Sequence, residues 1–287
     1  MSPLDFVRQF VMGISSGMVI FLMAAGMSLV MSGMNIINFG QGAFFILGAF
    51  LCFSLTAVMN FWWALVLAPL IVAVLGGLTE FLLRPLYGKS ILYQLLLTMG
   101  VAFVIIDGIR TIWGKSIRTI VVPDFVSSTV SFLGLDFPAY YIFITIISAI
   151  VALGLWLMFE RTTVGMLFRA IISDRDMVGN LGINVALIFS SMFMFGVWLS
   201  GVAGVLMAPI IGIDAQLAIQ ALFTLMTVLV IGGLTSMRGA LVGSLIVGVA
   251  NALGSMLLPW FYTLIPAALM IIVLLIRPEG LFGKAEG

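Results

Sequence analysis

The chain of 287 residues contains no histidine, a single cysteine and very few charges. Without histidine it cannot build a histidine-ligated haem or zinc site, or a histidine proton relay. Because Cys52 is the only cysteine, an internal disulfide is impossible. The net charge of +1 gives no electrostatic basis for binding nucleic acid. These absences exclude several common classes of metal, redox and nucleic-acid-binding protein.

Charged residues make up only 8% of the chain, whereas soluble domains carry about 25%. Hydrophobic residues make up 63%, and the mean hydropathy is +1.31. So few charges cannot cover a water-facing surface, so the surplus apolar surface must face lipid or other subunits. The composition predicts an integral protein of the inner (plasma) membrane with almost no soluble mass.

The motifs of an enzyme are also missing. Gly-Lys-Ser occurs at 88–90 and at 114–116, but a phosphate-binding loop needs another glycine five residues earlier, where Leu83 and Ile109 stand. No paired carboxylates and no nucleophile–base set are present. We therefore expect no catalytic residues, no metal ligands, no cofactor and no ATP hydrolysis in this chain.

What the chain does have is a succession of long apolar runs, each near the roughly 20 residues that a membrane-spanning helix needs. They predict one all-α domain, 1–287, folded as a polytopic transmembrane helix bundle of about 8–9 spans. The expected spans are 10–32, 41–58, 61–83, 91–112, 139–159, 185–207, 219–236, 239–258 and 260–276.

The second run begins irregularly, because the amides Asn35, Asn38 and Gln41 and two glycines interrupt the apolar pattern. This predicts a broken helix near 35–45. Irregular backbone at membrane depth is tolerated only where it is buried in protein or lines a cavity. The three amides could therefore line the substrate path and bind a polar solute. Alternatively, they could hydrogen-bond neighbouring helices.

Two stretches are polar. Residues 113–138 are expected to form an external loop, and residues 160–184 two short helices in the cytoplasm. In the second stretch an apolar stripe recurs at i, i+3, i+4 and i+7, which indicates one helix face; its members are Val164, Leu167, Phe168 and Ile171. Ser173 and Asp176 form an S-x-x-D pattern that predicts the start of the next helix.

The apolar stripe needs a protein surface to cover it. It can pack on a partner, since an apolar patch on a loop usually marks one, or on the chain's own helix ends. If a partner covers it, Gly165 and Gly182 would allow close backbone approach, and Arg169 and Asp174 would make polar contacts at the rim.

Charges inside the expected spans are few. Glu80 and Arg84, four residues apart, and Asp107 and Arg110, three apart, are best explained as local ion pairs near span ends. An ion-driven carrier usually needs a charge near the membrane midplane, and these spans carry none. We therefore expect energy to come from elsewhere and keep an ion-coupled secondary carrier as the second candidate.

The positive-inside rule orients the chain. Placing loop 160–184 and the C-terminus in the cytoplasm leaves outside only Arg8, Arg110, Lys115 and Arg118 of the 12 basic residues. The inside then holds Arg84, Lys89, Arg161, Arg169, Arg175, Arg238, Arg277 and Lys284. Nine spans would put the N-terminus outside, whereas a re-entrant segment 41–58 would put it inside.

Four stretches together resemble the permease subunits of branched-chain amino acid ABC importers, in particular the shorter of the two membrane subunits. They are Gly33–Gly42, the loop from Thr163 to Asn184, Gly232–Gly243 and Arg277–Gly283. Two residues depart from the family pattern: Gln41 replaces its usual histidine, and Val178 replaces a common alanine.

The resemblance implies a permease that forms half of a translocation path. Its expected partners are a related second permease subunit, two cytoplasmic ATPase subunits that bind ATP and Mg²⁺ and seat the loop 160–184, a periplasmic solute-binding protein and membrane lipid. The expected solute is a branched-chain or hydrophobic amino acid, or a related small polar molecule.

Overall fold

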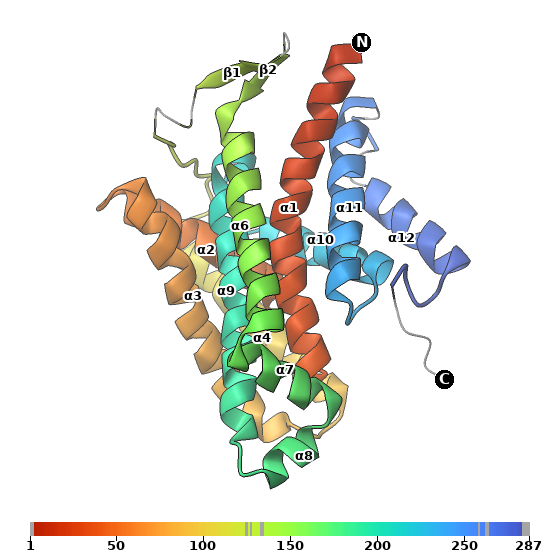
Figure 1. Cartoon of the computed structure of the whole chain (residues 1–287). Helices are drawn as coiled ribbons and strands as arrows, with labels where there is room; N and C mark the ends of the chain where they lie inside the picture. The colour runs from red at the N-terminus through yellow and green to blue at the C-terminus, as the bar shows by residue number, and fades with distance from the viewer. Residues whose placement is uncertain are drawn as a thin grey trace.

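The computed structural model describes residues 3–123, 126, 128–132, 135–257, 259–261 and 264–282. Lys284 and the last residue of the fourth stretch, Gly283, lie outside the described residues. The all-α class is confirmed (Figure 1). The helices are α1 (Pro3–Met34), α2 (Gln41–Thr56), α3 (Phe61–Leu83), the short 3-10 helix η1 (Arg84–Leu86), α4 (Ile91–Trp113), α6 (Ala139–Arg161), α7 (Thr163–Ser173), α8 (Arg175–Asn180), α9 (Val185–Ile211), α10 (Leu217–Gly232), α11 (Met237–Leu257) and α12 (Ile265–Ile276).

Each of the nine expected apolar runs forms a helix, but the helices differ in length. Among the described residues, six helices are long and apolar enough to cross a membrane: α1, α3 with η1, α4, α6, α9 and α11. Helices α2 and α10 have 16 residues each, and α12 has 12. Of the nine predicted runs, six therefore form helices long enough to span a membrane and three form shorter apolar helices.

Glycines set the closest helix crossings. Gly26 on α1 lies against the backbone of Gly196 on α9, so that a Cβ on either residue would overlap the other's carbonyl oxygen. Gly13 and Gly17 of α1 pack in the same way against α11 around Gly248. Small residues let helix backbones approach this closely in a membrane, where van der Waals packing drives association. Helix α1, whose middle is almost wholly buried, is thus held between α9 and α11.

The polar stretches lie at opposite ends of the bundle. In the loop 113–138, strands β1 (Thr129–Phe132) and β2 (Leu135–Pro138) pair as an antiparallel hairpin that the sequence did not predict. Figure 1 shows this hairpin near the N-terminus, and α7 and α8 at the other end of the molecule. At that second end Ser32 of α1 donates to the carbonyl of Thr235, just before α11.

Candidate functional site

The expected helix break is present between α1 and α2. Helix α1 ends at Met34, residues 35–40 are irregular, and α2 begins at Gln41. Asn35 adopts a positive φ of 53°, which asparagine tolerates better than most residues. Its side chain is exposed, whereas Asn38 and Gln41 are fully buried. The break therefore folds back into the interior of the subunit.

The side chains of Asn38 and Gln41 form hydrogen bonds with each other and with backbone groups around the helix break. Asn38 Nδ2 donates to Gln41 Oε1 at 3.1 Å, and Asn38 Oδ1 accepts from the amide of Gly40 at 3.0 Å. Gln41 Nε2 donates to the carbonyl of Gly196 on α9 at 2.9 Å. Buried polar groups are costly unless they are paired, so this network stabilises the break.

A hydroxyl on α4 also holds the break. Thr98 Oγ1 accepts from the amide of Phe39 at 3.2 Å and lies 3.4 Å from the carbonyl of Ile37. Four helices therefore meet around the irregular segment. The described contacts match the helix–helix hydrogen-bonding interpretation; that Asn35, Asn38 and Gln41 line a solute path stays a prediction.

The stretch 160–184 forms the two expected short helices, but the second one begins one residue away from the predicted cap. Thr162 caps α7 by accepting from the amide of Gly165. Asp174, not Ser173, caps α8, since its Oδ1 accepts from the amides of Asp176 and Met177 at 3.0 and 2.9 Å. The S-x-x-D interpretation is wrong because Ser173 is the last residue of α7.

The apolar stripe of α7 is divided between two surroundings. Phe168 and Ile171 are each 3% exposed, and they pack in one cluster with Val178 of α8 and Met192 of α9. Leu167 packs against the edge of the same cluster, whereas Val164 is exposed. The expectation that Phe168 and Ile171 face a partner is corrected: the chain's own helices cover them, which was the second alternative.

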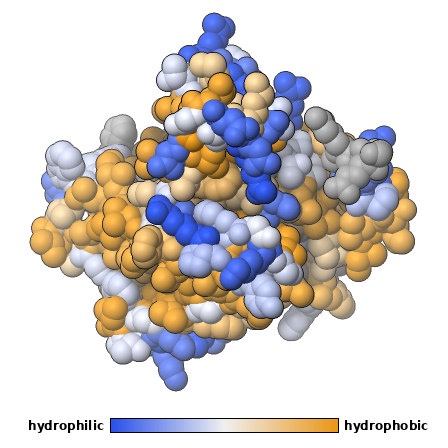
Figure 2. Space-filling model, turned by 90° about the horizontal axis from the view of Figure 1, so that it is seen from below, coloured by the Kyte–Doolittle hydropathy of each residue, from blue (hydrophilic) through white to orange (hydrophobic). Residues whose placement is uncertain are grey.

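A different apolar surface faces outward at this end. Its members, here called the outer face, are Val164, Met166, Met177, Leu181 and Leu187, all exposed large hydrophobic residues. Figure 2, seen from the α7–α8 end, shows hydrophobic and hydrophilic residues intermixed there. Exposed large hydrophobic side chains gathered at one end of the molecule make this end a candidate contact surface for a partner.

The remaining predicted coupling residues have different roles. Gly165 packs directly on the last turn of α6, because a Cβ there would overlap the carbonyl of Met158. Gly182 has φ +77° with open space around it, so it serves the turn before α9. Arg169 lines a groove next to α1, and Asp174 is the cap described above.

A buried carboxylate lies beside these helices. Glu80 on α3 is 1% exposed and accepts from Arg84 Nε at 3.1 Å, from the Tyr87 hydroxyl at 2.6 Å and from Ser190 Oγ on α9 at 2.8 Å. Burial, with the hydrogen bond to Glu80, raises the pKa of Tyr87, so its hydroxyl stays a donor. The Tyr87 ring meets Phe189 edge to face.

The sequence predicted only part of this cluster. The ion pair of Glu80 with Arg84 is confirmed. The Glu80 carboxylate, however, is buried in the protein and does not extend toward the membrane–water interface. The spacing of Glu80, Arg84 and Tyr87 places them on one side of successive helical turns, so the sequence alone indicates that Tyr87 can reach Glu80. Ser190 is 110 residues away, so only the packing of α9 on α3 brings it to the carboxylate. The pair of Asp107 with Arg110, at 3.4 Å, is confirmed and exposed.

Comparisons with known proteins cover nearly the whole chain. A sequence model of the family described as branched-chain amino acid transport system / permease component matches residues 9–274. The high-affinity branched-chain amino acid transport system permease protein BraD of Pseudomonas aeruginosa is 30% identical over 297 residues, which cover 98% of this chain and 97% of the relative. The corresponding permease protein LivH of Escherichia coli K12 is 28% identical over 303 residues, covering 99% and 97%. A solved structure, PsaBC from Streptococcus pneumoniae in complex with Fab, is 16% identical with a TM-score of 0.49 over 96% of this chain and 92% of that chain.

Proposed function

This chain belongs to the branched-chain amino acid transport permease family and is a permease subunit of an ABC importer, and we propose that it forms half of the path for branched-chain or similar hydrophobic amino acids. The single observation that carries the proposal is the match to permeases of that named solute class over 98% of the chain. The ion-coupled carrier is dropped, because the family match assigns the chain to an ABC importer.

The proposal extends to the partners. A related second permease would complete the path, and two cytoplasmic ATPase subunits would bind ATP and Mg²⁺, so that the chain itself needs no cofactor and acts as one permease domain, 1–287. A periplasmic protein would deliver the solute. The outer face supports an ATPase docking surface at the α7–α8 end, because its exposed Met177 and Leu181 have no lipid to contact if this end projects into water.

We place the α7–α8 end in the cytoplasm and the chain in a bacterial inner membrane. The described C-terminal residues support a cytoplasmic C-terminus. Leu281 and Phe282 donate to the carbonyls of Ile231 and Gly232 at the end of α10, next to the loop whose Thr235 bonds Ser32. The C-terminal residues thus lie near the same end of α1 as α7.

Reconstitution of the complete importer in vesicles tests the proposal. With the second permease, the ATPases and the binding protein present, leucine uptake should require internal ATP and should persist when ionophores collapse ion gradients. The purified chain alone should hydrolyse no ATP, since Leu83 and Ile109 occupy the loop positions that need glycine. ATP-independent uptake abolished by an ionophore would contradict the assignment. Competition by a panel of amino acids, urea and short amides identifies the solute.

A further inference from the structure

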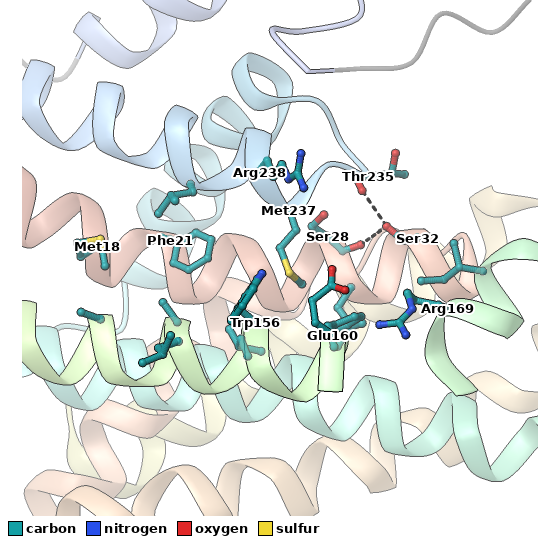
Figure 3. A pocket seen from close by; sticks show the side chains of 18 of the residues that line it. Met18, Phe21, Ser28, Ser32, Trp156, Glu160, Arg169, Thr235, Met237 and Arg238 are labelled. Atoms are coloured by element: carbon teal, nitrogen blue, oxygen red, sulfur yellow. Dashed lines mark hydrogen bonds between the residues drawn. The ribbon is translucent and has the colours of Figure 1, made fainter. Parts of the chain in front are cut away.

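A groove of about 680 Å³ runs along α1 between α6 and α11 (Figure 3). On α1 it is lined from Met18 to Ser32, which at 1.5 Å per residue corresponds to a length of about 21 Å. Its shaft is apolar, with Phe21 from α1, Trp156 from α6 and Leu245 from α11. A groove this long greatly exceeds the size of an amino acid and suits a long apolar chain.

The end of the groove near α7 is polar and carries net positive charge. Arg169 from α7, Arg238 from α11 and Glu160 from α6 line it. None of these three side chains makes an ion pair within the described residues. Ser28, which is 1% exposed, also lines the groove, and its hydroxyl has no hydrogen-bond partner in the described part of the chain. A buried hydroxyl without a partner requires an explanation, and because Ser28 lines the groove, a bound molecule is in a position to supply the missing acceptor.

The groove is open along the outer surface of this chain, on the side of α6. The wall formed by α6 is among the most exposed of the long apolar helices, with only 17% of its most apolar window buried. Leu153 and Trp156, which line the groove, are 57% and 53% exposed. Where this side of the chain faces lipid, a molecule from the bilayer enters between α6 and α11 without crossing the bundle.

We propose that the groove binds an anionic phospholipid. One acyl chain lies along the shaft, the phosphate lies between Arg169 and Arg238, and the Ser28 hydroxyl donates to an ester oxygen. Basic pockets between transmembrane helices bind anionic headgroups, and the unpaired arginines provide the matching charge. The inference goes beyond the proposed transport function and does not depend on the solute.

The test measures lipid binding to the purified importer by native mass spectrometry. Phosphatidylglycerol should bind more tightly than phosphatidylethanolamine, and Arg238→Gln should weaken phosphatidylglycerol binding about fivefold, the contribution typical of one basic residue at an anionic surface. The matched control is Arg161→Gln, since Arg161 is an exposed cation at the end of α6 that does not line the groove. It should leave the affinity unchanged.

Two further variants test the groove. Ala152→Trp places a large ring among the groove residues and should displace the acyl chain. Ser28→Ala removes the hydroxyl without filling space and should weaken lipid binding. Equal binding of both lipids, equal effects of Arg238→Gln and Arg161→Gln, or displacement of the lipid by inorganic phosphate alone would overturn the proposal. Displacement by leucine would also overturn it, because the groove would then be part of the solute path.

Discussion

The hydroxyl of Ser190 on α9 donates to Oε2 of Glu80 on α3 at 2.8 Å, and it accepts from Arg84 Nη2 at 2.7 Å. One serine thus joins both members of an ion pair on the neighbouring helix. Ser190 immediately follows Phe189, which packs in the cluster that holds α7 and α8. The contact therefore connects α3 to the part of α9 on which α7 and α8 pack.

Ser190→Ala should lower the free energy of unfolding by about 1.5–3 kcal/mol, because a buried carboxylate loses a hydrogen bond. Thermal unfolding of the purified subunit in detergent measures the change. The matched control is Ser191→Ala, since the exposed Ser191 bonds only to a carbonyl of its own helix, that of Ile188. Equal unfolding midpoints for the two variants would show that the Glu80 contact contributes nothing.

Asn38→Leu should reduce both stability and uptake. The substitution leaves the amide of Gly40 and Oε1 of Gln41 buried without their partners, at a cost of about 1–3 kcal/mol. Asn35→Gly is the control for stability alone, because glycine adopts the positive φ of this exposed position at least as readily. The two roles are separated by kinetics: normal stability with a raised KM for uptake would favour direct solute contact by Asn38.

Leu181→Asp should release the ATPase subunits without unfolding the permease. Leu181 is 68% exposed on the outer face, so the new carboxylate meets water until a partner covers it. Phe168→Asp should instead unfold the α7–α8 region, since Phe168 is 3% exposed. Val58→Asp is the control for added surface charge, because Val58 lies between α2 and α3 and is 85% exposed. Copurification and thermal unfolding are read together, and full ATPase retention by the Leu181 variant would refute docking there.

Gly232→Ala should destabilise the crossing of α10 with α11 by about 1–3 kcal/mol. A Cβ at Gly232 would overlap the backbone of Gly239, and the reverse holds as well, so neither helix can accommodate the methyl group without moving. Gly154→Ala on α6 has open space around it and should leave stability unchanged or raise it by up to about 1 kcal/mol. Circular dichroism during heating compares the two, and equal loss would contradict the packing argument.

The sequence predicted the elements that depend on local composition. Apolar runs of nearly 20 residues place the helices, because burying their surface in lipid requires no knowledge of the neighbours. The amides of Asn38 and Gln41 similarly marked the break at 35–40, since polar groups and glycines interrupt an apolar helix wherever it packs. The period of the α7 stripe also identified that helix.

What faces what was decided only by the tertiary structure. The stripe of α7 predicted an apolar helix face but not what covers it. Burial of apolar surface is non-directional, so covering Phe168 by a partner or by α8 and α9 gains a similar free energy. The sequence also did not identify the hydrogen-bond partner of Glu80 on another helix, because Ser190 reaches Glu80 only through the close packing of α3 on α9. Composition and period thus determined by themselves that this is a helical membrane protein. The close crossings at glycines such as Gly26 and Gly196 decided which side chains became a buried network, a groove and an outer face.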